Sequence, residues 1–145
     1  MAESRISSNP QNVITSSLDP SSPRFQKNAR AMADLVGTVA REQEKIREGG
    51  GAKAIESQHG KGRLTARERI ARLIDPRTDL LELGSYAAYE MYEEWGGAPG
   101  AGVVTGLGRV HGRLFMLIVN DATVKAGAFF PMTAKKVIRA HSFGI

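Results

Sequence analysis

Residues 120–136 contain the strongest chemical signal in the sequence. An apolar run, Leu114–Val119, is typical of a buried strand and ends just before them, and Pro131 is placed to open a helix. Between the two lies a turn formed by Lys125, Ala126, Gly127 and Ala128. A strand, a small-residue turn and a helix N-terminus can together present backbone N–H groups to an oxyanion or a phosphate. The alternative interpretation is a tight turn that merely needs small residues.

A second candidate is the basic segment 59–70, with the sequence His-Gly-Lys-Gly-Arg-Leu-Thr-Ala-Arg-Glu-Arg-Ile. Thr65 and Glu68 have the spacing of a capping box, in which each side chain bonds the other residue's backbone N–H. This spacing predicts a helix with Ile70, Leu73 and Ile74 on its buried face. The helix should stop at the Asp-Pro pair that follows Ile74.

Other chemistries are excluded by spacing. Gly106, Gly108 and Gly112 do not form a dinucleotide-binding fingerprint, because a strand and not a helix follows them. The pair Gly60-Lys61 is not a phosphate-binding P-loop, since the first glycine of that motif is missing. The three histidines have no metal-ligand spacing, and no Gly-x-Ser-x-Gly segment offers a serine nucleophile. We therefore expect no metal in this chain.

Composition indicates a globular protein. Of the 145 residues, 41% are hydrophobic and 24% are charged, and cysteine is absent. No apolar run approaches the ~20 residues that a membrane span needs, and the first residues lack a secretory layout. The net charge is +5, but the basic region has almost no interleaved aromatic residues for stacking bases. We expect a cytoplasmic protein with no nucleic-acid partner and no membrane contact.

Three segments follow from the pattern of residues along the chain. Residues 1–22 are rich in Ser, Asn and Pro and are predicted to form a disordered N-terminal tail. Residues 23–77 are predicted to form a helical arm. Its first helix is capped by Ser22, runs for about 24 residues along one apolar stripe, and ends at three consecutive glycines, 49–51. Residues 78–145 are predicted to form the third segment.

The third segment has the pattern of a small sheet followed by a helix. A short strand is expected at 80–83, a surface excursion at 86–102, and two long strands at 103–110 and 113–119 around a His111-Gly112 hairpin turn. The second long strand is apolar on both faces, which favours the middle of a covered sheet. The helix that Pro131 opens should bury Met132, Val137 and Ile138.

Both candidate segments resemble the carboxyltransferase β subunits of biotin-dependent acyl-CoA carboxylases, of the methylcrotonoyl-CoA and propionyl-CoA carboxylase type. The likeness rests on residues 59–76, 102–110 and 120–136, which match the family in order and spacing. It covers roughly residues 18–140. Ala126 stands where the family usually has glycine, so a positive φ there would cost on the order of 1 kcal/mol. After Ala140 the sequence departs from the family, and we expect a truncated or frameshifted subunit.

The resemblance implies an α/β fold, an incomplete crotonase-like β-β-α spiral preceded by a long N-terminal helix. Residues 78–145 would be the opening part of the N-terminal carboxyltransferase domain. The implied reaction transfers carboxylate from carboxybiotin to an acyl-CoA through a thioester enolate held by backbone N–H donors. 3-Methylcrotonoyl-CoA is favoured as substrate, and propionyl-CoA or acetyl-CoA remains possible. Biotin would arrive on a biotin carboxylase or biotin carrier subunit, and the full-length protein would be a homo-oligomer.

The resemblance also assigns roles to residues of this chain. Lys125, Ala126, Gly127 and Ala128 would line the acyl-CoA site. One or two of Lys61, Arg63 and Arg67 would lie near the coenzyme A phosphates; the alternative is a capped helix with a solvated basic face. No catalytic side chain is expected, because carboxybiotin is thought to supply the base and the principal glycine pair of the oxyanion hole lies downstream in the family. This fragment alone would then be inactive. The alternative function is a catalytically inactive remnant or assembly module that binds an intact carboxylase.

Overall fold

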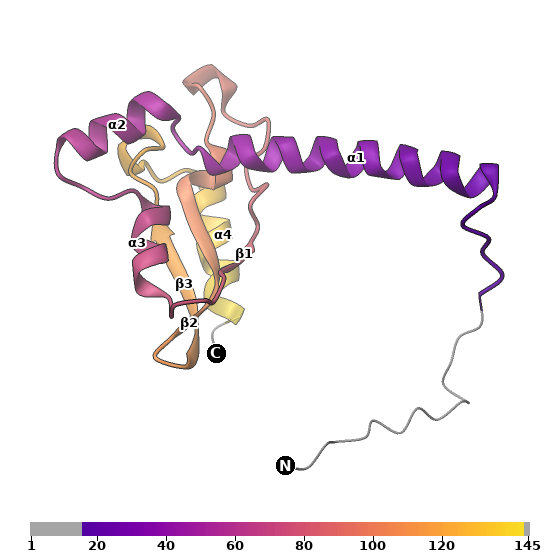
Figure 1. The fold of residues 1–145 in the computed structure, drawn as a ribbon. Helices are drawn as coiled ribbons and strands as arrows, with labels where there is room; N and C mark the ends of the chain where they lie inside the picture. Colours follow the sequence, from indigo (N-terminus) through magenta and orange to yellow (C-terminus); the bar gives the residue numbers. More distant parts are fainter. Residues whose placement is uncertain (1–15, 144–145) are drawn as a thin grey trace, which may run out of the picture. The chain divides into compact units, whose positions relative to one another are not determined.

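The computed structural model describes residues 16–143 and divides into two compact units, one ending at Thr38 and one beginning at Val39. Most of the tail expected at 1–22 lies outside the described residues. The first unit contains a turn and the N-terminal part of helix α1 (Pro23–Arg47) (Figure 1). The Ser22 hydroxyl accepts a hydrogen bond from the Phe25 N–H at 3.3 Å, which confirms the predicted cap.

Helix α1 has the predicted length and stop, but its apolar stripe is largely exposed. The helix has 25 residues and ends just before the glycine triplet. Met32 and Val36 are 60% and 59% exposed, whereas Ile46, near the C-terminal end, is buried. The stripe therefore has no cover along most of its length among residues 16–143.

The second unit is a three-stranded antiparallel sheet between helices. After α2 (Ala52–Gly60) and α3 (Ala66–Leu73) come β1 (Leu81–Leu83), β2 (Val103–Val110), β3 (Arg113–Asn120) and α4 (Pro131–Phe143), with strand order β1-β2-β3. Figure 1 shows α3 and α4 on opposite sides of the sheet.

The hairpin between β2 and β3 forms as predicted. His111 and Gly112 have φ of 50° and 75°, and both donate their N–H groups to the Asp75 carboxylate at 2.6 and 2.7 Å. A left-handed pair at the two central positions is the geometry that suits a tight hairpin between right-twisted strands. Asp75 thus both follows helix α3 and fixes the turn.

Glycines on β2 let helix α3 approach the sheet closely. Val104 packs with Ala66 and Ile70 in one buried cluster. A β-carbon on Gly108 would lie 2.9 Å from Cγ2 of Ile74, and one on Gly106 would lie 2.6 Å from the Leu81 carbonyl oxygen. Side chains at these two positions would push α3 and β1 away from β2.

Strand β3 is not in the middle of the sheet, contrary to the sequence prediction. Within residues 16–143 it pairs only with β2, and it is β2 that is central and buried. Leu114, Phe115 and Ile118 of β3 are exposed by 59%, 45% and 38%. The apolar composition of β3 is real, but the elements that would cover it are not among the described residues.

The segment 86–102 was predicted to be a surface excursion, and this was only partly right, because residues 89–91 and 93–96 are exposed but three alanines are buried. Ala88, Ala98 and Ala101 are buried in one cluster with Val124. Small side chains and left-handed backbone, such as φ of 62° at Ala88 and 56° at Ala101, allow an aperiodic segment to pack tightly. Periodicity could not reveal this core, because the segment forms turns and short 3₁₀ helices (η2, Glu93–Trp95; η3, Pro99–Gly102).

Two predicted buried faces were partly wrong. Leu73 of α3 is 50% exposed, and in α4 it is Thr133, Lys136 and Ala140 that are buried, whereas Ile138 is 66% exposed. Helix α4 is therefore rotated from the orientation that apolarity alone indicates, because buried hydrogen bonds replace apolar contacts on its inner face. The predicted division of the chain at residue 78 stays a prediction.

Candidate functional site

The loop after β3 begins with a buried polar turn. Asp121 is buried, and its carboxylate Oδ1 accepts hydrogen bonds from the Thr123 N–H at 2.9 Å and the Thr123 hydroxyl at 2.6 Å. The Asp121 N–H donates to the Gly102 carbonyl at 2.9 Å, and Val124 is almost completely buried. These contacts fix the start of the loop to the core of the second unit.

The predicted turn itself has a left-handed backbone at three consecutive residues. Lys125, Ala126 and Gly127 have φ of 48°, 55° and 85° and form the 3₁₀ turn η4 (Lys125–Gly127). The sequence analysis made the cost of alanine at 126 conditional on a positive φ, and that condition is met. A non-glycine residue in this conformation costs on the order of 1 kcal/mol. Such strain is found more often at functional sites than elsewhere.

Several of the N–H groups expected to face a ligand already donate within the protein. Gly127 and Ala128 donate to the carbonyl oxygens of Val124 and Lys125 at 2.9 and 3.0 Å. At the start of α4, the Met132 N–H donates to the Tyr92 hydroxyl at 3.3 Å. The assignment of the turn to acyl-CoA stays a prediction, and it now depends mainly on the side chain of Lys125 and the outer surface of the turn.

The Lys125 side chain is exposed and lies beside the segment 93–97. A β-carbon on Gly96 would lie 2.7 Å from Lys125 Nζ. The ring of Trp95, which is 59% exposed, stacks on Tyr92 at 6.0 Å, and Tyr92 contacts Phe130 at 4.8 Å. The side chain makes no hydrogen bond or ion pair with residues 16–143, so its ammonium group is available to a ligand.

The capping box predicted at α3 is confirmed. The Thr65 hydroxyl accepts from the Glu68 N–H at 3.3 Å, and the Glu68 carboxylate accepts from the Thr65 N–H at 2.7 Å. His59, at the end of α2, lies 3.0 Å from the same carboxylate. Hydrogen bonds from His59 and Thr65 lower the pKa of Glu68 to about 2. The His59–Glu68 contact joins the C-terminal end of α2 to the N-terminal end of α3.

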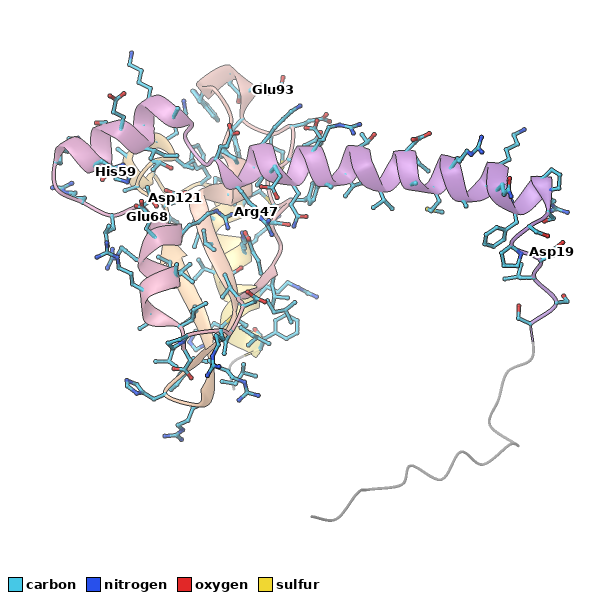
Figure 2. All side chains as sticks on the ribbon, in the orientation of Figure 1. Asp19, Arg47, His59, Glu68, Glu93 and Asp121 are labelled. Atoms are coloured by element: carbon cyan, nitrogen blue, oxygen red, sulfur yellow. The ribbon has the colours of Figure 1, made fainter. Side chains whose placement is uncertain are left out.

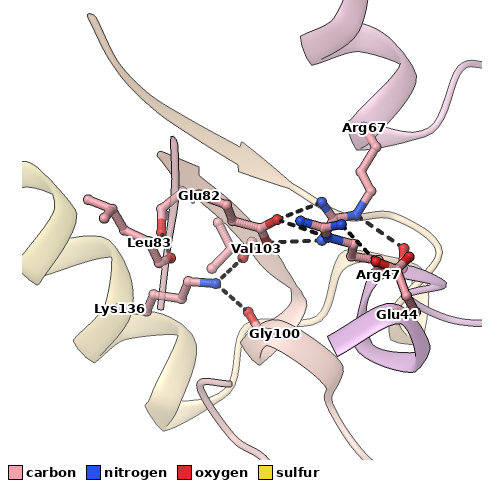
Figure 3. Close-up of polar contacts among 9 residues, drawn as sticks. Glu44, Arg47, Arg67, Glu82, Leu83, Gly100, Val103 and Lys136 are labelled. Carbon is pink, nitrogen blue, oxygen red and sulfur yellow. Dashed lines mark hydrogen bonds and ion pairs between the residues drawn. The ribbon is translucent and has the colours of Figure 1, made fainter. Parts of the chain in front are cut away.

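Arg67 is committed to an ion pair with a strand residue (Figure 3). Its two terminal nitrogens donate to the two carboxylate oxygens of Glu82 at 2.8 and 2.9 Å, and its Nε donates to the Arg47 carbonyl at 3.1 Å. Burial would raise the pKa of Glu82, but the hydrogen bonds and charge of Arg67 hold it below its ordinary value. These contacts support the structural alternative for Arg67, because its donors are used to tie α3 and the end of α1 to β1.

Lys136 is a buried cation that apolar periodicity did not indicate. Its Nζ donates to the carbonyl oxygens of Gly100 and Val103 at 3.0 and 2.7 Å (Figure 3). Burial lowers the pKa of Lys136 to about 8, although the charge of Glu82 opposes this shift. On the same face, the Thr133 hydroxyl donates to the Ala101 carbonyl at 2.6 Å. The inner face of α4 therefore satisfies the backbone of the segment before β2.

Of the three basic residues predicted to lie near the coenzyme A phosphates, Arg67 lies beside the loop after β3. Arg67, Glu68, Asp121 and Thr123 line a small cavity of about 160 Å³, and Figure 2 shows the labelled Glu68 and Asp121 on the neighbouring segments. Three carboxylates, with Glu48 as the third, and two arginines, Arg47 and Arg67, line this cavity, so its net charge does not favour a phosphate. The side chains of Lys61 and Arg63 are exposed and make no hydrogen bond or ion pair with residues 16–143.

The structure adds residues that the sequence analysis did not single out. Glu82 and Lys136 lie in segments expected to be a strand and an amphipathic helix. Gly50 contacts Thr123, although the two are 73 positions apart. A polar residue on the inner side of a predicted helix, such as Lys136 three residues after Thr133, is a signal that could have been used. Residues 16–143 contain no cluster of three His, Cys, Asp or Glu side chains placed to hold a metal ion.

Comparison with known proteins gives the family. Residues 57–144 match the model of the carboxyl transferase domain. The chain belongs to the carboxyl transferase domain family. The match includes both α3 and the loop after β3, and it extends past Ala140, where the sequence analysis placed the end of the resemblance.

Individual relatives agree with this family. The chain is 45% identical over 130 residues to the probable mitochondrial methylcrotonoyl-CoA carboxylase beta chain of Drosophila melanogaster, covering 90% of this chain and 22% of the relative. It is 45% identical over 97 residues to the biotin-dependent 3-methylcrotonyl-coenzyme A carboxylase beta1 subunit of Mycobacterium tuberculosis, covering 67% of this chain and 18% of the relative.

A solved structure supports the fold. The beta subunit of geranyl-CoA carboxylase from P. aeruginosa superimposes with a TM-score of 0.78 at 29% identity, covering 89% of this chain and 24% of that one. The chain thus spans about a fifth of the length of the relatives it matches. The predicted α/β class, with a long N-terminal helix before the opening part of a crotonase-like fold, is confirmed. None of the helices in residues 16–143 is long and apolar enough to cross a membrane.

Proposed function

We propose that this chain supplies part of the acyl-CoA-binding surface of a carboxyltransferase subunit. The reaction of the whole subunit would move carboxylate from carboxybiotin, delivered by a biotin-carrying partner, to an acyl-CoA. 3-Methylcrotonoyl-CoA is the favoured substrate, because relatives named for this substrate are 45% identical to the chain. Propionyl-CoA and acetyl-CoA remain alternatives. A homo-oligomer of complete subunits is part of the same proposal.

The observation that supports this proposal best is the turn after β3. It combines a strained backbone at Ala126 with an exposed ammonium group at Lys125 that has no partner among residues 16–143. The start of the turn is fixed by buried contacts at Asp121 and Val124. A rigid support beneath a free cation is suited to binding an anionic ligand, because little ordering of the protein is needed on binding. Coenzyme A is such a ligand, since its phosphates are anionic.

The chain's own residues would bind and orient in this proposal, and none is assigned to proton transfer. Lys125 would pair with a phosphate or another anionic group of coenzyme A. Lys61 and Arg63 lie on the turn before α3, have no side-chain partner within residues 16–143, and would add positive charge near the ligand. We do not include Arg67, because Glu82 already pairs with it through two hydrogen bonds. Oxyanion stabilisation would come largely from donors outside residues 16–143.

Calorimetric titration with 3-methylcrotonoyl-CoA tests this proposal. Binding to the 145-residue chain is expected, and it should weaken about tenfold in Lys125→Ala, the typical loss for one charge-assisted contact. The matched control is Lys53→Ala, which removes an exposed lysine of α2 outside both candidate segments. The corresponding pantetheine thioester, which lacks the nucleotide phosphates, should bind more weakly. Equal binding of both thioesters, or no binding, would contradict the proposal.

The second candidate function is a catalytically inactive module that assembles with an intact carboxylase. The uncovered apolar stripe of α1 and the exposed strand β3 favour this alternative, because such surfaces are typical of protein contacts. Size-exclusion chromatography of the chain with a purified methylcrotonoyl-CoA carboxylase tests it. Co-elution that Met32→Glu abolishes would support assembly through α1, whereas separate elution would exclude assembly with this carboxylase.

A further inference from the structure

The glycines at the end of α1 lie directly against the loop after β3. The Gly50 N–H donates to the Thr123 hydroxyl oxygen at 3.0 Å. A β-carbon on Gly50 would lie 1.8 Å from the Thr123 carbonyl oxygen, and one on Gly49 would lie 2.6 Å from the Thr123 hydroxyl oxygen. No side chain fits at Gly50 unless the loop moves, because the atom it would meet belongs to the backbone.

Ending the helix does not by itself explain all three glycines. Gly49 and Gly51 have φ of 57° and 83°, a conformation that favours glycine and suits a helix stop. Gly50 is not among the residues with positive φ, so its backbone would accept alanine. What excludes a side chain at Gly50 is the contact with Thr123. The middle glycine therefore serves the loop and not the helix end.

Thr123 transmits this contact to the candidate site. Its hydroxyl accepts from Gly50 and donates to the Asp121 carboxylate, which also accepts from the Thr123 N–H. Asp121 and Thr123 are both buried, so these bonds are not replaced by water without cost. Val124 follows, fixed in the core, and Lys125 comes next. Only Thr123 and Val124 thus lie between Gly50 and the strained turn.

We propose that Gly50 and Thr123 are positioning residues that set the conformation of the turn 125–128 for acyl-CoA binding. This inference rests on the proposed function of that turn. The coupling is reciprocal: a ligand at the turn stabilises the Gly50–Thr123 hydrogen bond, and a displacement at the C-terminal end of α1 weakens ligand binding by the same factor.

The structural half of the inference is that the Gly50–Thr123 contact holds the turn 125–128 in place. Amide hydrogen exchange measured by NMR tests it, because the Gly50 N–H is the donor of that hydrogen bond. In Thr123→Val, which keeps the side-chain shape and removes the hydroxyl, exchange at Gly50 and at residues 125–128 should be about tenfold faster. Exchange in β2 should not change. Thr123→Ser, which keeps the hydroxyl, should behave as the wild type. Equal acceleration in β2 would show a global loss of stability and overturn the positioning role.

A glycine pair gives the matched steric control. Gly50→Ala should accelerate exchange in the turn, whereas Gly60→Ala should not, because a β-carbon on Gly60 would meet nothing within 4 Å. Neither position has a positive φ, so alanine causes no backbone strain at either one, and the two changes differ only in the space available for the β-carbon. Equal exchange in the two variants would contradict the inference. If Gly50→Ala does not fold, Thr123→Val still decides the question.

The functional half of the inference is that this contact supports ligand binding at the turn, and coenzyme A is the probe that tests it. Saturating coenzyme A should slow exchange of the Gly50 amide in the wild type, and Thr123→Val should weaken coenzyme A binding about tenfold, equivalent to one lost hydrogen bond. Binding that Thr123→Val leaves unchanged would overturn this inference alone. No binding to the wild type would overturn the proposed function and the ligand half of the inference with it, while the exchange data would still decide the structural half.

Discussion

Two regions of this molecule contain similar residue types and use them in opposite ways. In the first, Arg67, Glu82 and Lys136 lie between helices and the sheet, and each forms hydrogen bonds to a partner. In the second, the turn after β3, Lys125 is exposed beside a strained Ala126. The first region stabilises the fold, because Arg67 is paired with Glu82 and the buried Lys136 ammonium group is bonded to two carbonyl oxygens. In the second, a fixed loop carries a cation with no partner in the described part of the chain, which is the arrangement that a ligand can use.

The comparison shows that residue type alone does not separate binding from structure. Arg67 and Lys125 both lie in segments that match the family, and both were predicted to contact acyl-CoA. They differ in whether the cationic side chain already forms an ion pair with a carboxylate of the protein. Glu82 is paired with Arg67, whereas no acidic side chain among residues 16–143 pairs with Lys125.

The largest expected effect comes from breaking the first region. Glu82→Ala removes the acceptor of two Arg67 hydrogen bonds and leaves a partly buried guanidinium unpaired, so we expect a loss of about 3 kcal/mol in the free energy of unfolding. Urea unfolding measures it. Glu44→Ala is the control, because Glu44 also pairs with an arginine but is exposed, and it should cost less than about 1 kcal/mol. Equal losses in the two variants would mean that the buried pair has no special role.

Lys136→Met should give the next largest effect, and its size should depend on pH. In the variant, two carbonyl acceptors lose their hydrogen-bond donor, which destabilises the fold, but no charge has to be buried, which offsets part of this loss. We expect a net loss of about 1 kcal/mol in the free energy of unfolding at pH 7. The folded-state pKa of about 8 is below the ordinary value, so the unfolded chain binds more protons above pH 8. The stability of the wild type relative to the variant must therefore rise as pH increases through 8, by about 1–2 kcal/mol at pH 9.5.

Urea unfolding of both proteins at several pH values checks the Lys136 prediction. The difference in the free energy of unfolding between wild type and Lys136→Met is the quantity of interest. The other lysines and tyrosines titrate in both proteins, so their contributions cancel in this difference. A difference that shrinks above pH 8 would show that the sign of the shift is wrong. A difference independent of pH would mean that burial does not perturb Lys136.

In the second region, Ala126→Gly should stabilise the protein. The φ of 55° at Ala126 is costly for alanine and not for glycine, so removal of the β-carbon should add about 1 kcal/mol to the free energy of unfolding, less the extra entropy of glycine in the unfolded chain. The melting temperature, compared with that of Ala122→Gly, measures it. Loss of stability in Ala126→Gly would show that the turn is not strained.

The smallest effect is expected from the free cations of the basic segment. Lys61→Ser and Arg63→Ser remove exposed side chains without partners among residues 16–143, so each should change stability by less than about 0.5 kcal/mol. Arg67→Ser in the same segment should cost several times more. Thermal unfolding of the three variants gives the ranking. A large loss in Arg63→Ser would remove the distinction that we draw within this segment.

The sequence was sufficient to predict the long helix α1, helix α3 and the β2–β3 hairpin, with the signals at their ends. Ser22 caps α1, the Thr65–Glu68 box starts α3, and His111-Gly112 turns the hairpin, because each of these signals is local and depends on a few neighbouring residues. The positive φ at Ala126 could also be anticipated from the resemblance. The family was recognised from motifs, and the match to the carboxyl transferase domain model confirms the family.

Burial was harder to predict, because it depends on what lies next to an element in space. β3 is more apolar than β2, yet β2 is buried because it lies between two strands and two helices. Lys136 points inward because its ammonium group donates to the carbonyl oxygens of Gly100 and Val103, which apolar periodicity does not indicate. The Gly50–Thr123 contact joins positions far apart in the sequence and required the fold itself.

The most direct test of the distinction between the two regions is an NMR titration of the isotope-labelled chain with coenzyme A. We expect amide shift changes that saturate and are concentrated at residues 125–128, with smaller changes at Lys61 and Arg63. The amides of Arg67 and Glu82 should remain unperturbed. Shift changes centred on Arg67 and Glu82 with none at Lys125 would contradict the account.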